Sequence, residues 1–313
     1  MPQSDSVLAT AYRYFLFVAE AGSVRAAARN LNVAASAVSR QLLLLEAQLG
    51  IELFERHGRS LTLSAAGTVL LKTLKVLQTG HEEALAVLSG FQELKRGRIR
   101  LATVESIAVT ILPDLVTAFN RTYPGIQISI TVAGSDAVIE LVRDHDADLG
   151  FAFNPTRLEG LAVDFEQGFP LGATMAPSHP LADKAKLTLS DCLRFPVAWP
   201  AHGLSLRAIL DEALTGAKAA HRPPEAAFEC NSLRLMASLA RSGGCIAFQT
   251  RIGIEQDIHA GSLLFRPLAD RGLPPDRLML VPRPRLAKGT AASVFAGLAR
   301  QYLQKMNRRG SLS

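Results

Sequence analysis

A chain of 313 residues is too long for one small binding module and accommodates two or three domains. Its 48% hydrophobic content supplies buried cores and argues against disorder, while the net charge of +6 is compatible with nucleic-acid binding without establishing it. We find no apolar run of the roughly 18 residues that a membrane helix needs, and no secretory signal pattern. We therefore expect a cytoplasmic protein with no membrane partner.

The first predicted elements are three short helices. The first spans residues 12–21, and two more fill Gly22 to Leu49 on either side of a break at Asn32, a residue type that tolerates the left-handed backbone of a tight turn. Apolar residues recur on one face of the third helix, namely Val38, Leu42, Leu45 and Leu49. We expect Ser36 to cap that helix. Polar residues near its start favour a helix-turn-helix whose last helix enters the DNA major groove, the alternative being an ordinary helical hairpin with a solvated arginine.

Two extended runs around His57 and Gly58 follow, and they predict a hairpin, or wing, beside the DNA backbone. Ser64 is then placed to cap a helix that reaches about Leu94. Apolar residues form a stripe along one side of this helix, which is too long to bury that stripe by itself. It is therefore either a helix for self-association or a linker packed on its own chain.

The segment from Tyr12 to Leu71 resembles the amino-terminal domain of LysR-type transcriptional regulators. The resemblance rests on AVSRQ, LE, LG, LFER and the closing AG, with no gaps. Ala35 stands where the family often has a glutamine for base contact, which shifts weight to neighbouring polar residues. The candidate DNA-binding residues are Arg25, Ala35, Ser36, Ser39, Arg40, Arg56 and Arg59. The resemblance also implies that the long helix is an antiparallel dimerisation helix.

From Gly97 onward, strands and helices alternate, which predicts a parallel, doubly wound α/β sheet. The first helix of this region is expected as one element from Ile107 to Tyr123. The expected domains are therefore an all-α winged helix-turn-helix over 1–63, a linker and dimerisation helix over 64–94, and an effector-binding domain over 95–313. The resemblance implies that this last domain has two lobes and the fold of periplasmic binding proteins, with lobe one at about 97–168 plus 268–300 and lobe two at about 169–267. The fold class is α/β overall.

Ligands of such sheets lie beyond the carboxyl ends of the strands, next to helix amino termini. Applied to the predicted elements, this rule selects residues from both lobes as effector-binding candidates. They are Thr103, Val104, Ser106, Ser135, Phe153, Asn154, His202, Ser205, Asn231, Ser232, Gln249 and Thr250. A serine at a helix start is more often a cap than a ligand contact, so the hypothesis depends on several such groups meeting across one cleft. Hydroxyls, amides and free helix N–H groups favour a small carboxylate or another polar metabolite.

An enzymatic function is disfavoured. Glu105 and Asp136 could be offered as an acid–base pair, but no nucleophile elbow, phosphate loop or metal-ligand cluster accompanies them. The three cysteines, Cys192, Cys230 and Cys245, lack metal-ligand spacing and are expected to be reduced, structural thiols. No metal and no cofactor are expected.

Together these features predict a sequence-specific DNA-binding transcriptional regulator that responds to a small-molecule effector. Its expected partners are promoter DNA, the effector and further copies of itself in a homodimer and homotetramer, with RNA polymerase as a candidate and the nucleoid as its location. Two alternatives stay open. One is a solute-binding protein with an added helical domain, and the other is an architectural DNA-binding protein whose cleft is vestigial.

Overall fold

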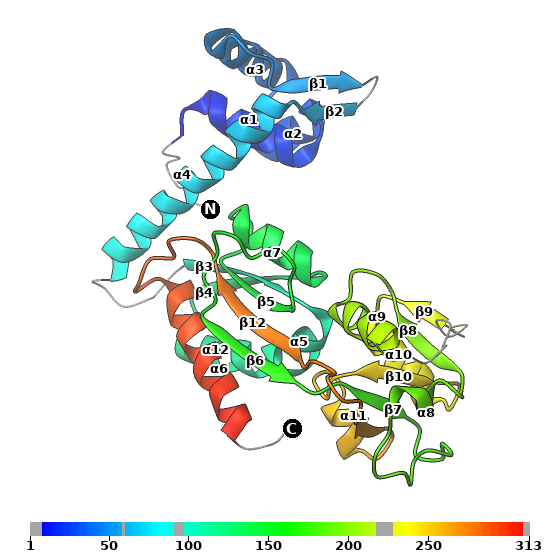
Figure 1. Cartoon of the computed structure of the whole chain (residues 1–313). Coiled ribbons are helices and arrows are strands. Elements are labelled where there is room, and N and C mark those ends of the chain that lie inside the picture. Colours follow the sequence, from blue (N-terminus) through cyan, green and yellow to red (C-terminus); the bar gives the residue numbers. More distant parts are fainter. Residues whose placement is uncertain (1–7, 58–59, 91–96, 217–227, 309–313) are drawn as a thin grey trace. The chain divides into compact units, whose positions relative to one another are not determined.

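The computed structural model of the chain describes residues 8–57, 60–90, 97–216 and 228–308. The chain forms two compact units, Met1–Ser89 and Gly90–Ser313 (Figure 1). None of the helices within the described ranges combines the length and the apolar character needed to span a lipid bilayer.

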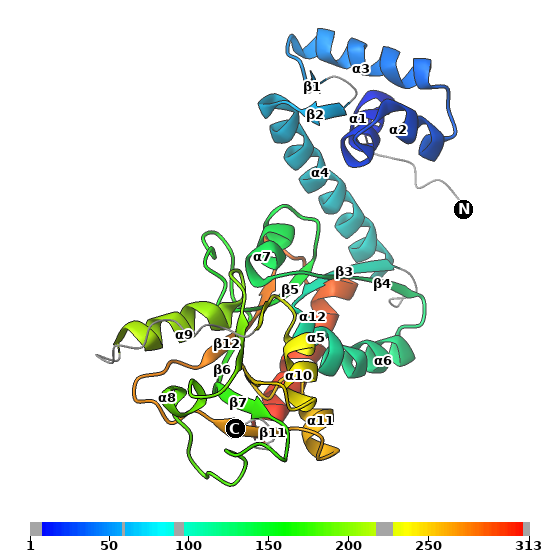
Figure 2. The same cartoon turned by 90° about the vertical axis from the view of Figure 1, so that its right-hand side faces the viewer.

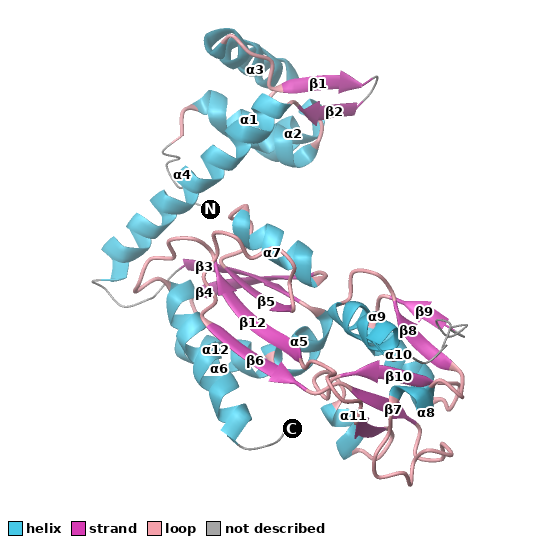
Figure 3. Ribbon diagram, viewed as in Figure 1, coloured by secondary structure: helices cyan, strands magenta, loops and turns pink. Residues whose placement is uncertain are grey.

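Helices dominate the amino-terminal unit, and its two strands form an antiparallel hairpin (Figure 3). Its described elements are α1 (Thr10–Ala21), α2 (Val24–Leu31), α3 (Ala35–Leu49), β1 (Phe54–His57), β2 (Ser60–Leu63) and α4 (Ala65–Gly90). One core joins the first three helices, in which Phe15, Val18 and Val38 are fully buried. Ala27 and Ala28 of α2 are buried at the crossing, where small side chains let the helices approach. The predicted helix-turn-helix and its hairpin are both present.

The ends of these helices follow from individual residues. Asn32 ends α2 with a φ of 55°, in the left-handed region that asparagine tolerates. Ser64 precedes α4, and its Oγ accepts a hydrogen bond of 3.0 Å from the N–H of Gly67, which confirms the expected cap. The expectation that Ser36 caps α3 is wrong, because α3 begins one residue before it and the cap position belongs to Ala34. Ser36 is instead an exposed residue of the first turn.

Lobe one of the carboxy-terminal unit is built on a sheet with the strand order β4-β3-β5-β12-β6. Its strands are β3 (Gly97–Thr103), β4 (Ile126–Val132), β5 (Leu149–Phe153), β6 (Phe165–Phe169) and β12 (Asp276–Pro282). Its helices are α5 (Glu105–Thr110), α6 (Leu112–Thr122), α7 (Ser135–Arg143) and α12 (Ala291–Arg308). α6 and α12 cover one face of the sheet and α7 covers the other (Figure 2). Side chains alternate accordingly along β3, where Leu101 packs on the α6 and α12 face and Ala102 on the α7 face.

Lobe two has a second sheet, with the order β11-β7-β10-β8-β9. Its strands are β7 (Gly172–Met175), β8 (Val197–Pro200), β9 (Phe228–Cys230), β10 (Ile246–Gln249) and β11 (Leu264–Pro267). Its helices are α8 (Leu189–Cys192), α9 (Ser205–Gly216), α10 (Leu233–Arg241) and α11 (Glu255–His259). α8 and α9 pack on one face, around Trp199 and Phe248, and α10 and α11 pack on the other. The two sheets are separate in Figure 3, where the strands are magenta.

The predicted parallel order holds for part of each sheet. β3 is parallel to β4 and β5, and β8 is parallel to β9 and β10. β12 and β7, in contrast, run antiparallel to their neighbours. The chain crosses from lobe one to lobe two between β6 and β7, and it returns between β11 and β12. A strand that enters its sheet from the other lobe begins at the edge where the parallel strands end, and it therefore runs in the opposite direction.

The helix expected from Ile107 to Tyr123 is two helices, α5 and α6, with a break at Ile111. Pro113 stands in the first turn of α6, and a proline there lacks the N–H that a continuous helix needs and clashes with the preceding turn. The break separates α5 from α6, and Glu105 at the amino terminus of α5 contacts Ser232 of lobe two.

A buried ion pair stabilises the lobe-one sheet at the edge where its parallel strands begin, which is the edge away from lobe two. Asp148 accepts hydrogen bonds from Arg100 Nη2 at 3.0 Å and from Arg283 Nε at 3.1 Å. Burial opposes the ionisation of Asp148, but the hydrogen bonds and charges of the two arginines outweigh it and hold the pKa of this carboxyl below its usual range.

Candidate functional site

The start of α3 presents polar side chains opposite a buried apolar face. Ser36 and Arg40 are exposed, while Val38 and Leu42 on the other side are buried with exposures of 0% and 6%. Ser39 is half-buried between them. Residues three and four apart lie on the same side of a helix. The polar groups therefore form one surface that the core does not use.

The remaining DNA-binding candidates lie in other positions. Arg25 is exposed at the start of α2, and Ala35 is half-buried at the first position of α3. The backbone of Arg56 belongs to β1, where it is paired with Leu61 of β2. The side chain of Arg56 and all of Arg59 lie outside the described residues.

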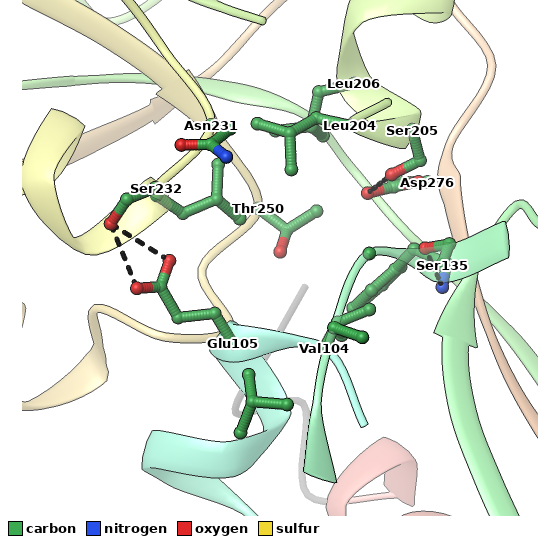
Figure 4. A pocket seen from close by; sticks show the side chains of 15 residues that line it. Val104, Glu105, Ser135, Leu204, Ser205, Leu206, Asn231, Ser232, Thr250 and Asp276 are labelled. Atoms are coloured by element: carbon green, nitrogen blue, oxygen red, sulfur yellow. Dashed lines mark hydrogen bonds between the residues drawn. The ribbon is translucent and has the colours of Figure 1, made fainter. Parts of the chain in front are cut away.

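A cavity of about 310 Å³ lies between the two lobes of the carboxy-terminal unit. We call it the inter-lobe cavity, and its lining residues are Val104, Glu105, Val132, Ala133, Gly134, Ser135, Phe153, Leu204, Ser205, Leu206, Asn231, Ser232, Leu233, Thr250 and Asp276. Seven effector-binding candidates meet here, as Figure 4 shows for most of them, namely Val104, Ser135, Phe153, Ser205, Asn231, Ser232 and Thr250. The segments that carry them come from both lobes, so the topological rule brings together groups that are far apart in the sequence.

The other five candidates do not line this cavity. Thr103, Ser106 and Gln249 are buried, with exposures of 0%, 3% and 1%. Asn154 and His202 line a neighbouring cavity of about 460 Å³. The two cavities share Ser135, Phe153, Leu204 and Ser205 as lining residues.

Two carboxylates of the inter-lobe cavity were not among the candidates. Glu105 begins α5, and it was considered only for acid–base chemistry. Asp276 is the first residue of β12, and the rule that selects the carboxyl ends of parallel strands cannot find it, because β12 runs antiparallel to β5. The register pairs Leu278 with Phe153, which places the amino-terminal end of β12 beside the carboxyl end of β5. A lone acidic residue before an apolar strand was the signal available in the sequence.

Asp276 connects the two lobes. Its Oδ1 accepts a hydrogen bond of 2.8 Å from Asn154 Nδ2 of lobe one, and its Oδ2 accepts one of 3.1 Å from Ser205 Oγ at the start of α9 in lobe two. Burial, which leaves the residue 3% exposed, raises the pKa of Asp276 to about 7, and these two hydrogen bonds only partly offset the effect. The carboxyl group therefore titrates near neutral pH.

Glu105 makes a second connection between the lobes. Its Oε1 accepts a hydrogen bond of 2.9 Å from Ser232 Oγ, and its Oε2 accepts one of 3.3 Å from the backbone N–H of Arg234 in the first turn of α10 (Figure 4 shows the serine contact). Near these contacts, a Cβ on Gly253 of lobe two would lie 3.1 Å from the Cβ of Ser106. The lobes thus approach closely on this side of the cavity.

This arrangement suits binding. Apolar walls with a few convergent polar groups are typical of small-molecule sites. Within the described ranges, no group of three or more His, Cys, Asp or Glu is placed to hold a metal ion. The fold and the cavity define a class of protein, a helix-turn-helix module joined to a two-lobed ligand-binding domain.

Comparison with known families agrees with that class. The family described as "LysR substrate binding domain" matches residues 92–304, and the family "Bacterial regulatory helix-turn-helix protein, lysR family" matches residues 10–68. The chain belongs to the LysR family of DNA-binding transcriptional regulators. Neither match supports the solute-binding or the architectural alternative.

One curated relative and two solved structures are also similar to this chain. A probable nitrogen assimilation transcriptional activator of Synechococcus elongatus is 28% identical over 279 residues, covering 87% of this chain and 88% of the relative. A full-length OxyR variant from Pseudomonas aeruginosa has a TM-score of 0.71 at 19% identity and covers 94% of both chains. Full-length CbnR, solved in complex with its target DNA, has a TM-score of 0.61 at 20% identity, with 93% of this chain and 98% of CbnR covered. These two structures share the fold of the present chain.

Proposed function

We propose that the protein binds specific operator DNA through the exposed start of α3, with a small effector in the inter-lobe cavity modulating that binding. The observation that carries the proposal is the polar surface of Ser36, Ser39 and Arg40, which lies opposite the buried face of α3. Helices of this kind insert their first turns into the major groove. Arg25 and Ala35 would add to the DNA contacts, and Arg56 and Arg59 of the hairpin would contact the DNA backbone.

The effector part of the proposal depends on the two lobes. A ligand that bridges groups from both lobes favours the arrangement in which those groups converge, so its binding energy shifts the population toward that arrangement. A coupling of about 1–3 kcal/mol between effector and DNA is typical of such systems. We propose a small polar metabolite as the effector, of which the carboxylate anticipated from the helix amino termini is one kind.

We further propose that the chain acts as a homodimer that pairs into a tetramer, with residues 1–63 as the DNA-binding domain, 64–94 as the linker and dimerisation helix and 95–313 as the effector-binding domain. Exposed apolar residues on α4 support the self-association, since Val69, Val76 and Leu77 are 66%, 47% and 53% exposed. Contact with RNA polymerase and a location on the nucleoid would follow from action at promoters.

The test is a titration of the purified full-length protein with the duplex from upstream of its own gene, against a scrambled duplex, at several salt concentrations. Related regulators often act on adjacent promoters, which makes this fragment the first choice. A preference of about 10³-fold or more at physiological salt is expected for a specific regulator. Equal and steeply salt-dependent binding to both duplexes would indicate phosphate contact alone and would contradict the proposed specificity.

Arg40→Ala tests the recognition surface directly. Loss of one base or phosphate contact is expected to weaken operator binding by about 1–3 kcal/mol. The matched control is Arg121→Ala, which removes the same charge from the exposed side of α6 and should leave the affinity unchanged. Equal affinities for wild type and Arg40→Ala would show that the recognition surface lies elsewhere.

A further inference from the structure

The inter-lobe cavity carries acidic side chains and no basic one. Of the 15 described residues that line it, Glu105 and Asp276 bear carboxylates, and none is Lys, Arg or His. Figure 4 shows the two carboxylates on different sides of the cavity, one from α5 and one from β12. A ligand in this cavity therefore meets negative charge from two directions.

The helix amino termini at the cavity, which would otherwise favour an anionic ligand, already have carboxylates from the chain itself. At α10, both Ser232 Oγ and the backbone N–H of Arg234 donate to the carboxylate of Glu105. At α9, Ser205 Oγ donates to the carboxylate of Asp276. At the start of α10 and at Ser205 of α9, donors that could bind a ligand carboxylate thus already bind carboxylates of the chain.

Two arginines next to the cavity have partners elsewhere. Arg234 turns its guanidinium to Asp257, at 2.9 Å between Nη1 and Oδ2. Arg207 of α9 pairs with Asp211, at 2.7 Å between Nε and Oδ2. Two more helices begin at the cavity, α5 with Glu105 as its first residue and α7 with Asp136 in its first turn. An incoming anion would find neither arginine available and would meet the carboxylates of Glu105 and Asp276.

Asp276 also lacks a charged partner. Within the described residues it accepts hydrogen bonds from Asn154 and Ser205 only, both of which are neutral. Buried carboxylates are usually paired with a cation, because desolvation of an unpaired charge is costly. The raised pKa of Asp276 has the same cause, since its two neutral hydrogen-bond donors only partly compensate for the loss of water. The group that this cavity lacks is a positive charge.

We propose that the inter-lobe cavity binds a small organic cation, a protonated amine whose nitrogen pairs with Asp276 and whose apolar part lies against the hydrophobic wall. That wall consists of Val104, Val132, Phe153, Leu204, Leu206 and Leu233. Glu105 adds to the negative potential. The inference rests on the proposed function, in which this cavity holds the effector, and it replaces the carboxylate anticipated from the helix amino termini with a ligand of the opposite charge.

The experiment compares amines and carboxylates that carry the same hydrocarbon group, by isothermal titration calorimetry on the full-length protein. The pairs are phenethylamine with hydrocinnamate and cyclohexylamine with cyclohexanecarboxylate. The amines are expected to bind about tenfold or more tightly than the matched carboxylates, because only the amines supply Asp276 with an ion-pair partner.

Three variants assign the binding to the cavity. Asp276→Asn keeps the shape of the side chain and removes its charge, and it should weaken amine binding about tenfold or more. Glu105→Gln should weaken amine binding by a smaller factor, and it serves as a second test of the cavity if Asp276→Asn folds poorly. Asp183→Asn, at an exposed position of lobe two, should leave amine affinity unchanged.

The proposal is overturned if the carboxylates bind as tightly as the amines, if amine affinity is the same in Asp276→Asn, or if no amine binds at millimolar concentrations. Carboxylate binding that weakens in a cavity variant such as Ser232→Ala would overturn the charge assignment while leaving the effector cavity intact. Operator titrations with the same preparations show separately whether the DNA-binding function holds.

Discussion

Removing the charge of Asp276 should stabilise the protein and flatten its dependence on pH. Asp276→Asn replaces one carboxyl oxygen by an amide NH₂ of similar size, so the side chain can still accept from Asn154 and can donate to Ser205 Oγ. In the wild type the ionised carboxylate is buried, 3% exposed, with neutral partners only. The variant removes the cost of that buried charge.

The magnitude follows from the raised pKa. A shift from the ordinary value of 3.8 to about 7 corresponds to a cost of roughly 4 kcal/mol for the fully ionised state. Because the folded pKa lies above the unfolded one, the folded protein binds more protons between about pH 4 and pH 7. The free energy of unfolding of the wild type therefore falls as the pH rises through this window, and the whole cost is present above about pH 7.

The assay is urea unfolding of wild type and Asp276→Asn at about pH 5 and about pH 8. Unfolding is monitored by the fluorescence of Trp199, the only tryptophan of the chain, which is buried in lobe two. The free energy of unfolding of the variant minus that of the wild type is expected to grow by about 3 kcal/mol from the lower to the higher pH. Contributions from all other groups cancel in this difference. Parallel pH dependences in the two proteins would refute the account of Asp276 as an unpaired buried carboxylate.

Asp148→Ala is expected to destabilise the fold by about 3–5 kcal/mol in urea unfolding, because it leaves the buried Arg283 and the half-buried Arg100 without their carboxylate. Since the pKa of Asp148 is lowered, its contribution to the stability of the wild type is lost as the pH falls below the usual range of an aspartate. Gly80→Ala should raise the free energy of unfolding by about 1 kcal/mol, because a Cβ there meets nothing within 4 Å. Gly67→Ala should lower the free energy of unfolding, because its Cβ would clash with a backbone carbonyl oxygen. Equal effects of the two substitutions in thermal unfolding would contradict this distinction. Iodoacetamide at mildly alkaline pH should modify the half-buried Cys230 in the folded protein and spare Cys192, whose pKa burial raises to about 12; mass spectrometry of the peptides decides, and rapid alkylation of Cys192 would refute its burial.

The amino-terminal unit was predictable because its signals are local. The apolar period on α3 depends on residues at most a few turns apart, and the break at Asn32 and the cap at Ser64 depend on one residue type each. The placement of Ser36 as a cap failed for a local reason as well, since Ala34 leaves the turn in an extended conformation and lets α3 begin earlier. Competing starts one or two residues apart have similar energies, so the sequence alone did not separate them.

In the carboxy-terminal unit, the order of strands and helices was predictable from alternation, and this order selected Ser135, Ser205 and Ser232 beside the inter-lobe cavity. The predicted alternation did not include β6, β11 and α11. The reversed direction of the strands at the crossings was not predictable either, because it depends on where the chain passes between the lobes and not on a local pattern.

The sequence by itself determined the family, the helix-turn-helix and the alternation that builds two lobes, because each is encoded in short patterns or in a contiguous match. Only the tertiary structure decided the charge of the cavity. Asp276 lies 122 positions from Asn154, and Glu105 lies 127 positions from Ser232. No pattern within a segment reports such pairs, because the distance between them is set by how two sheets meet after the chain has crossed twice between the lobes.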